Sequence, residues 1–253
     1  MDHSIKKNIY NNLSVWYRPG TEDEKVLSHS FDNDIFYREI PYLKVPANPC
    51  IVDVGAHIGT FSLLTVVRFP KCQVHAFEAS RETFEILNRN KLTNNLSNLI
   101  VYHQAMSGGD GIVRLFHSVA AGNWGHSITT ELSASYEEVQ SISLETFFTQ
   151  SNIGFIDLIK FNCEGAEFEI ILNTPSHILQ KIGIGIILYH EDLSDRRIEE
   201  LITLFRDLGF KCNHQPRRKG RGWLIVSNTA LYSSLYLFYR ALQRKLSRLF
   251  GNG

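Results

Sequence analysis

The sequence predicts an α/β fold with a mainly parallel β-sheet that helices cover on both faces. From residue 50 onward, short β-rich runs alternate with helical stretches, which is typical of parallel strands joined by crossover helices. The chain has 253 residues and 43% hydrophobic content, enough for one large core with appendages. The sequence shows neither an internal repeat nor a transmembrane run.

The stretch before residue 46 has no regular hydrophobic period, because aromatic and charged residues are mixed throughout it. We expect residues 1–45 to form a cap or lid of short elements. The core domain is expected over residues 46–228, and Pro46 and Pro49 indicate a loop at its start.

The alternating runs predict the core elements in order. Strands are expected at 50–54, 73–77, 99–106, 112–117, 156–162 and 183–190, followed by an antiparallel hairpin around the turn PRRKGRG at 216–222. Helices are expected from the loop after residue 54 to residue 69, and at 80–95, 164–173 and 194–209. Ser194 is the expected N-cap of the last helix and Gly209 its end. The polar stretch 118–138 is expected to be a long loop, and such loops tend to be functional or disordered.

Charge is distributed unevenly along a chain whose formal net charge is zero. No acidic residue follows Asp207, whereas nine Lys and Arg residues do. Near the end, leucines recur every three or four positions beside a stripe of arginines, which predicts a basic amphipathic helix over residues 229–253. Such a helix can lie on an anionic membrane, or it can dock on its own domain or on a second subunit.

The cysteines form no C-x-x-C pair, and the N-terminal residues lack the apolar segment of a signal peptide. We therefore expect a cytoplasmic protein with reduced thiols. If the C-terminal helix binds lipid, the protein would be peripheral on the inner face of the membrane.

The strongest indication of a binding site is VDVGAHIG at 52–59, which joins a strand to a helix. Gly55 permits a sharp turn and a close backbone approach by a ligand. Gly59 lets the helix pack closely, with its N-terminal amides toward the ligand. The dinucleotide pattern G-x-G-x-x-G is absent, and Asp53 precedes the loop. A carboxylate there suits a cationic group, such as the ammonium of S-adenosylmethionine, better than a pyrophosphate.

Glu78 ends the next predicted strand, about twenty residues after the glycine loop. A carboxylate at this position can accept hydrogen bonds from both hydroxyls of a ribose. NAD and S-adenosylmethionine both carry such a ribose. The alternative for Glu78 alone is an acidic residue stabilised near a helix N-terminus.

The runs VDVGAHIGTFS, HAFEAS and IKFNCEGAEFEI resemble the FkbM-type methyltransferases over about residues 50 to 190. The resemblance implies a class I Rossmann-like fold with a seven-stranded, mostly parallel sheet. It implies methyl transfer from S-adenosyl-L-methionine, usually to a hydroxyl of a sugar or natural product and occasionally to a carboxyl. The cofactor-binding residues that it implies are Asp53, Gly55, Ala56, His57, Gly59, Glu78, Ala79, Met106, Ser107 and Asn162.

Two positions depart from the family's usual pattern. Asn162 stands where the family run normally has Asp, so a divalent metal, which prefers carboxylate oxygens, is not expected. His57 stands where Asn is common. Because Asn162 carries no charge, a non-catalytic methyltransferase-like module, tethered by its basic tail to a membrane or an acidic partner, remains an alternative.

Three residues are the candidates for catalysis. His190 closes a predicted strand at the edge where open α/β sheets bind ligands, and it is the first candidate for a general base. Glu164 is the rival base, with a helix N-terminal carboxylate as its alternative role. Lys160 lies inside a strand and is therefore expected to be paired, with Glu164 or Glu167 as partner.

The acceptor is expected to be a small molecule or a glycan. Asn123, Trp124 and His126 of the long loop could stack on and hydrogen-bond a sugar ring, with the N-terminal cap as a second wall, and Glu191 could orient His190 or bind the acceptor. A nucleic acid is not expected, because no aromatic residues interleave with the basic patch. A nucleotide-dependent oxidoreductase is disfavoured by the absence of the dinucleotide loop.

Overall fold

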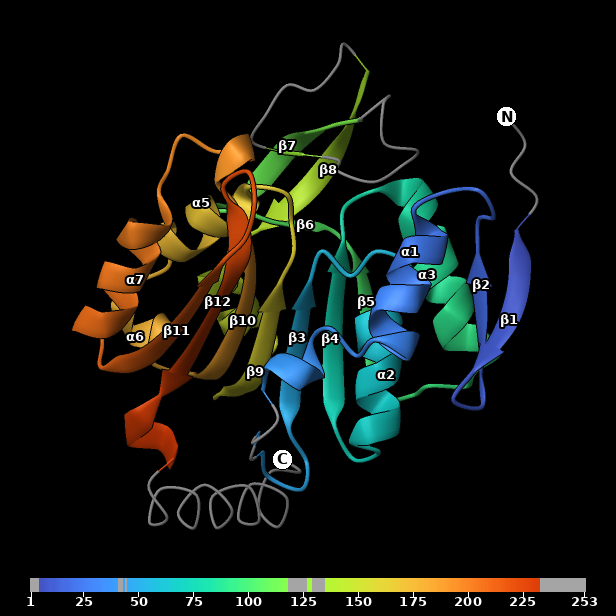
Figure 1. Cartoon of the computed structure of the whole chain (residues 1–253), viewed down its shortest axis with the longest axis horizontal. Helices are drawn as coiled ribbons and strands as arrows, with labels where there is room; N and C mark the ends of the chain where they lie inside the picture. Colours follow the sequence, from blue (N-terminus) through green and yellow to red (C-terminus); the bar gives the residue numbers. More distant parts are fainter. Residues whose placement is uncertain (1–4, 41–42, 44, 118–126, 129–134, 233–253) are drawn as a thin grey trace.

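The computed structural model describes residues 5–40, 43, 45–117, 127–128 and 135–232. A seven-stranded sheet lies at its centre (Figure 1). Its strands are β3 (Cys50–Val54), β4 (Gln73–Glu78), β5 (Leu99–His103), β9 (Ile156–Phe161), β10 (Ile182–His190), β11 (Phe210–Pro216) and β12 (Arg221–Asn228). They follow the order β11-β12-β10-β9-β3-β4-β5. The pairs from β10 to β5 are parallel, whereas β12 runs antiparallel to both β10 and β11. The predicted fold class and the closing antiparallel hairpin are therefore confirmed.

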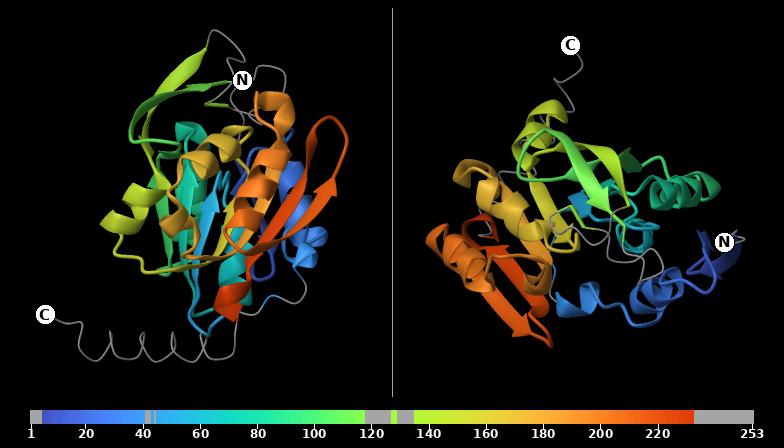
Figure 2. Two further views of the ribbon diagram at one scale, coloured as in Figure 1. Left: turned by 90° about the vertical axis from the view of Figure 1, so that its left-hand side faces the viewer. Right: turned by 90° about the horizontal axis from the view of Figure 1, so that it is seen from above.

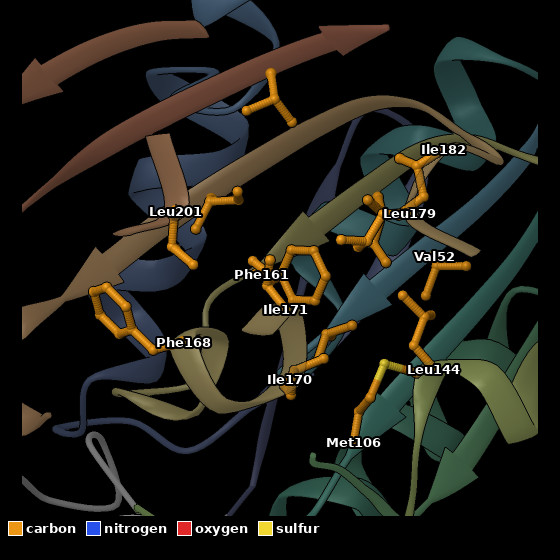
Figure 3. Close-up of a cluster of buried hydrophobic side chains, with 14 of the residues drawn as sticks. Val52, Met106, Leu144, Phe161, Phe168, Ile170, Ile171, Leu179, Ile182 and Leu201 are labelled. Atoms are coloured by element: carbon orange, nitrogen blue, oxygen red, sulfur yellow. The ribbon is translucent and has the colours of Figure 1, made fainter. Parts of the chain in front are cut away.

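Two hydrophobic cores lie on opposite faces of this sheet, because successive side chains of a strand alternate between faces. One core packs under α4 (Leu144–Gln150), α5 (Ala166–Asn173), α6 (Ser176–Leu179) and α7 (Ile198–Asp207). Figure 3 shows part of it, where Phe161 and Val52 of the sheet meet Ile170 and Ile171 of α5. The other core packs under α2 (Thr60–Arg68), α3 (Arg81–Thr93) and the N-terminal elements. Figure 2 shows the helices on both sides of the sheet.

A three-stranded sheet lies beside the carboxyl ends of the central strands (Figures 1 and 2). It contains β6 (Ala105–Met106), β7 (Gly111–Phe116) and β8 (Tyr136–Ile142). The predicted strand at 99–106 is thus divided between two sheets. The prediction of a loop through residue 138 is wrong at its end, because β8 begins at Tyr136 and pairs with β7. Helix α4 was not predicted, although Ser143 caps it by accepting a hydrogen bond from the amide of Thr146.

The N-terminal residues form a hairpin of β1 (Lys6–Tyr10) and β2 (Leu13–Tyr17) beside α3 (Figure 1). The short turns α1 (Asp23–Leu27), η1 (Ser28–Asp32) and η2 (Tyr37–Glu39) follow and pack in the core under α2. Two further short turns are η3 (Glu191–Leu193), between β10 and α7, and η4 (Thr229–Tyr232), which follows β12. Of the segment 229–253, for which we predicted a helix, residues 233–253 lie outside the described residues.

Two helix boundaries differ from the sequence-based expectation. Helix α7 begins at Ile198 with Arg197 as its N-cap, so Ser194 is not the cap. Gly209 does follow the end of α7, in the left-handed region at φ +84°. Within the part of the chain that the structure describes, no helix is both long and apolar enough to cross a membrane.

Asn90 on α3 joins the N-terminal hairpin to the glycine-rich loop. Its side chain is fully buried. Its Oδ1 accepts a hydrogen bond from the amide of Trp16 at 2.6 Å, and its Nδ2 donates to the carbonyl oxygens of Trp16 and Ile58 at 3.1 and 2.8 Å. One amide therefore satisfies backbone groups of two separate segments.

Replacement of Asn90 by Ala should lower the free energy of unfolding by about 2–4 kcal/mol, because it leaves buried backbone groups without partners. Urea denaturation measures this change. Leu92→Ala is the matched control on the same helix, since Leu92 is 64% exposed and its loss should cost less than about 0.5 kcal/mol. Equal stability of the two variants would contradict the bridging role of Asn90.

Candidate active site

A cavity opens where β3, β4 and β9 end and the three-stranded sheet begins. Open α/β sheets bind ligands at this edge. Its described lining residues are Val54, Gly55, His57, Phe77, Glu78, Ala79, Thr83, Gln104, Ala105, Met106, Leu115, Ile128, Asn162, Cys163, Glu164 and Ala166. Most of these side chains are apolar, and a few carboxylate, amide and imidazole groups lie among them. This composition is typical of small-molecule sites. We call the space that these residues line the first cavity.

The glycine-rich loop is held by its neighbours on both sides. The amides of Gly55 and Ala56 donate to the carbonyl oxygen of Phe77 at 3.1 and 2.9 Å. A Cβ on Gly55 would lie 2.1 Å from the carbonyl oxygen of Asn162, and its φ is +72°. The close approach of the chain after β9 therefore requires a glycine at position 55. Gly55 also lines the first cavity, and its contact with a ligand stays a prediction. A Cβ on Gly59 would instead meet Leu87 of α3 at 2.4 Å.

Glu78 lies at the end of β4 and lines the first cavity. Its Oε2 accepts a hydrogen bond from the amide of His57 at 2.8 Å, and its Oε1 accepts one from the amide of Ser80 at 2.9 Å. Each carboxylate oxygen keeps further acceptor capacity. Burial raises the pKa of Glu78 to about 7, against the opposing effect of these two amides. Both oxygens are thus oriented by the backbone and can accept further hydrogen bonds.

Lys160 and Asp53 form a buried pair between β9 and β3. The ammonium of Lys160 lies 2.9 Å from Oδ1 of Asp53 and also donates to the carbonyl oxygen of Gly55 at 2.6 Å. Oδ2 of Asp53 accepts a hydrogen bond from the hydroxyl of Ser62 at 2.7 Å. The expected pairing of Lys160 with Glu164 or Glu167 is wrong. Neither member of the pair lines the first cavity, so their contacts position the loop after β3.

Asn162 follows β9 and lines the first cavity. Its amide donates to the carbonyl oxygen of Val54 at 3.1 Å. Its side-chain Oδ1 is buried and has no hydrogen-bond partner among the described residues. A buried acceptor without a donor is costly, and a donor from a bound ligand would satisfy it.

The chain turns sharply at Glu164 and Gly165, between β9 and α5. Glu164 has φ +51° and Gly165 has φ +99°, and a left-handed conformation is strained for a residue other than glycine. His57 in the first cavity has φ +54° as well. Backbone strain of this kind concentrates at functional sites.

Glu167 and His190 form a second buried pair, behind Glu164. Oε1 of Glu167 accepts from the amide of His190 at 2.6 Å and lies 3.1 Å from its Nδ1. Burial alone would raise the pKa of Glu167, but the charge and hydrogen bond of His190 lower it overall. Burial alone would lower the pKa of His190, but Glu167 and then Glu164 raise it overall. The charged form of the pair is therefore favoured.

Glu164 connects this pair to the first cavity. Its Oε2 lies 3.7 Å from Nε2 of His190 and 3.8 Å from Nη1 of Arg221. Burial raises the pKa of Glu164, although the charges of His190 and Arg221 act in the opposite direction. His190 is 2% exposed and lines neither described cavity. Of the two expected bases, Glu164 is the one that faces the first cavity.

The remaining expected residues divide into three groups. Ala79 and Met106 line the first cavity, whereas Ala56, Gly59 and Ser107 do not. Glu191 lines neither cavity, and its Oε1 accepts from the amide of Ile198 at the start of α7. The loop residues Asn123, Trp124 and His126 lie outside the described residues.

Several lining residues were missed from the sequence, notably Thr83, Gln104, Leu115 and Ile128. Gln104 directly follows β5, but the predicted strand ran through residue 106, so the strand end at Gln104 was not recognised from the sequence. The other three depend on the packing of α3 and of the small sheet. No group of three or more His, Cys, Asp or Glu side chains suited to a metal ion occurs within the described ranges.

A second cavity adjoins the first, between α5 and the segment from η3 to α7. It shares Ile128 with the first cavity, and Gly165 in its wall directly follows Glu164. Its other described lining residues are Glu169, Leu172, Asn173, Asp192, Leu193, Ser194, Asp195, Arg196 and Glu200. No described residue before Val54 lines either cavity, although Asp23 of α1 lies 3.4 Å from the imidazole of His57 in the first cavity. The acceptor wall expected from the N-terminal cap stays a prediction.

Comparison with solved structures shows the fold alone. The structure named "putative rRNA-methylase" from Clostridium thermocellum has a TM-score of 0.50 at 8% identity and covers 77% of this chain and 94% of its own. Precorrin-6y C5,15-methyltransferase from Geobacter metallireducens has a TM-score of 0.46 at 9% identity, with 77% and 87% covered.

Comparison of sequences gives a more specific result. Methyltransferase sdnD of Sordaria araneosa is 26% identical over 157 residues, which are 50% of this chain and 61% of that protein. Methyltransferase 1 of Beauveria bassiana is 25% identical over 189 residues, 66% of this chain and 74% of its own. The chain thus spans less than two thirds of the Sordaria protein. The model of the methyltransferase FkbM domain matches residues 53–212, more than half of the chain, and the chain therefore belongs to the FkbM methyltransferase family.

Proposed function

We propose that the chain is an S-adenosylmethionine-dependent methyltransferase that methylates a hydroxyl oxygen of a small molecule or glycan. The observation that carries the proposal is the carboxylate of Glu78, held by the amides of His57 and Ser80 at the edge of the first cavity. In this position it suits the two hydroxyls of a ribose. Family membership supports the transfer of a methyl group.

The first cavity fits the cofactor in a second respect. The unpartnered Oδ1 of Asn162 lies in the same cavity as Glu78, and it would accept a hydrogen bond from the cofactor's ammonium. Asp53, which we expected at that ammonium, is instead bound to Lys160 and Ser62. Its proposed role is therefore to position the glycine-rich loop.

When bound, the cofactor supplies a methyl group on a positively charged sulfur, which is already a strong electrophile. The protein's contribution is then mainly alignment, which can supply about 7–11 kcal/mol of the barrier. Glu164 is the proposed general base that takes the proton of the acceptor hydroxyl. His190 and Glu167 orient it from behind rather than touching the acceptor. The second cavity, which begins beside Glu164, is the proposed path of the acceptor.

Three alternatives stay open. A carboxyl acceptor would need no base, and a non-catalytic module would bind the cofactor without turnover. A nucleic acid is still not expected, although proteins named as RNA methylases occur among the structures of this fold. Label transfer from methyl-labelled S-adenosylmethionine into fractionated polysaccharide, lipid, small-metabolite and RNA pools tests the acceptor class. Labelling of RNA alone, or of no pool, would contradict the proposal.

Binding of S-adenosylhomocysteine should strengthen as the pH rises through about 7. The raised pKa of Glu78 means that the carboxyl is protonated below that pH and ionised above it, and the ionised form has more acceptor sites for ribose hydroxyls. Glu78→Gln should weaken binding roughly ten- to hundredfold at high pH and remove this part of the pH dependence. Isothermal titration calorimetry from pH 6 to pH 8.5 measures both effects.

Glu85→Gln is the matched control for Glu78→Gln, because Glu85 is an exposed residue of α3. It should bind the ligand as the unchanged chain does. Affinity that is equal in Glu78→Gln and in the control would refute the ribose contact.

Glu164→Gln should lower turnover roughly 10²- to 10⁴-fold while cofactor affinity is kept, because the amide cannot take a proton. The assay is label transfer into the pool that the unchanged chain methylates. His190→Gln should have a smaller effect, since His190 does not face the cavity. Full activity of Glu164→Gln with loss in His190→Gln would instead make His190 the base.

A further inference from the structure

Arg221 is the first residue of β12 and lies in register with His190 at the end of β10. Its guanidinium contacts two carboxylates from different cavities. Nη1 lies 3.8 Å from Oε2 of Glu164, which lines the first cavity. Nε and Nη2 lie 2.9 to 3.0 Å from the oxygens of Asp192, which lines the second. Arg221 therefore lies at the boundary between the proposed cofactor and acceptor sites.

The backbone around Arg221 is fixed on both sides. The amide of Arg217 donates to the carbonyl oxygen of Arg221 at 2.7 Å and closes the hairpin turn. The amide of Glu191 donates to the carbonyl oxygen of Gly220 at 2.8 Å and ties the turn to η3. The planar guanidinium matches a carboxylate with two parallel contacts, so Asp192 holds it in one orientation. A third group, Glu164, then lies within reach of the remaining nitrogen.

The charges around Glu164 come from four elements. His190 of β10 and Arg221 of β12 favour its ionised form, whereas Glu167 of α5 and Asp192 of η3 oppose it. The thiol of Cys163 is adjacent, and burial raises its pKa well above its ordinary value, so it adds no charge. His190 loses its charge as the pH rises, but arginine stays charged throughout. Arg221 is thus the neighbour whose positive charge is permanent.

We propose that Arg221 is a positioning residue for Glu164. It holds the Glu164 carboxylate at the junction of the two cavities and favours its ionised form against the effect of burial, so that the carboxylate can take a proton from an acceptor hydroxyl. Asp192 orients Arg221 for this task. The inference rests on the proposed function of Glu164 as a base, but its physical content is a coupling between two side chains that is measurable without cofactor or acceptor.

The test is a titration of the full chain, labelled with ¹³C at glutamate carboxyl carbons and followed by NMR. The Glu164 signal is assigned by its disappearance in Glu164→Gln. In Arg221→Gln the titration midpoint of Glu164 should rise by about one pH unit, the lower end of the effect of an opposite charge at this separation. Arg221→Met should give the same rise and keeps the packing of the apolar stem, so it replaces the first variant if that one fails to fold. Arg221→Lys keeps the charge and should recover at least half of the shift.

Arg218→Gln is the control, since it removes a positive charge from the same hairpin turn at an exposed position. It should leave the midpoint of Glu164 unchanged. A midpoint that stays at its original value in folded Arg221→Gln or Arg221→Met overturns the proposal, and so does an equal rise in Arg218→Gln. Failure of the proposed function would be recognised separately, as a lack of S-adenosylhomocysteine binding by the unchanged chain.

Discussion

The buried contact between Lys160 and Asp53 is the interaction on which the site depends. The two residues occupy paired positions on the central strands β9 and β3, and both are nearly inaccessible to solvent. The three donor positions of the ammonium are taken by Asp53 and by the carbonyl oxygens of Val54 and Gly55. Loss of one partner from such a pair costs about 3–5 kcal/mol, because the other charge stays buried. The contact thereby fixes the glycine-rich loop against the end of β9.

The polar groups of the site follow from that arrangement. With the loop fixed, the amide of His57 reaches Glu78 at the end of β4, and the chain after β9 passes directly over Gly55. The next turn brings Glu164 into the first cavity at a strained backbone position. A second buried pair, Glu167 and His190, then supports Glu164 from behind. The Lys160–Asp53 pair thus positions the loop on the proposed cofactor side, and the Glu167–His190 pair positions the proposed base.

The fold and the position of the first cavity were predictable from the sequence, but the side-chain partners were not. Alternating strands and helices indicated the parallel sheet, and polar residues at strand ends indicated the edge at which the first cavity opens. The partner of Lys160 was misjudged because Asp53 is 107 positions away in the sequence. The two residues are neighbours only because β3 and β9 are adjacent in the sheet. Glu164 and Arg221 are also far apart in the sequence, and they approach each other because β12 pairs antiparallel with β10. Helix α4 was missed even though Ser143 and the apolar positions after it carried a local signal.

The most direct test of the central claim is a crystal structure of the chain with S-adenosylhomocysteine. The account predicts ribose hydroxyls on the carboxylate of Glu78, the ligand's amino group at Oδ1 of Asn162, and its sulfur on the side of the first cavity that faces Glu164. The Lys160–Asp53 pair should remain intact. A ligand bound outside the first cavity, or one whose amino group displaces Lys160 from Asp53, would contradict this account.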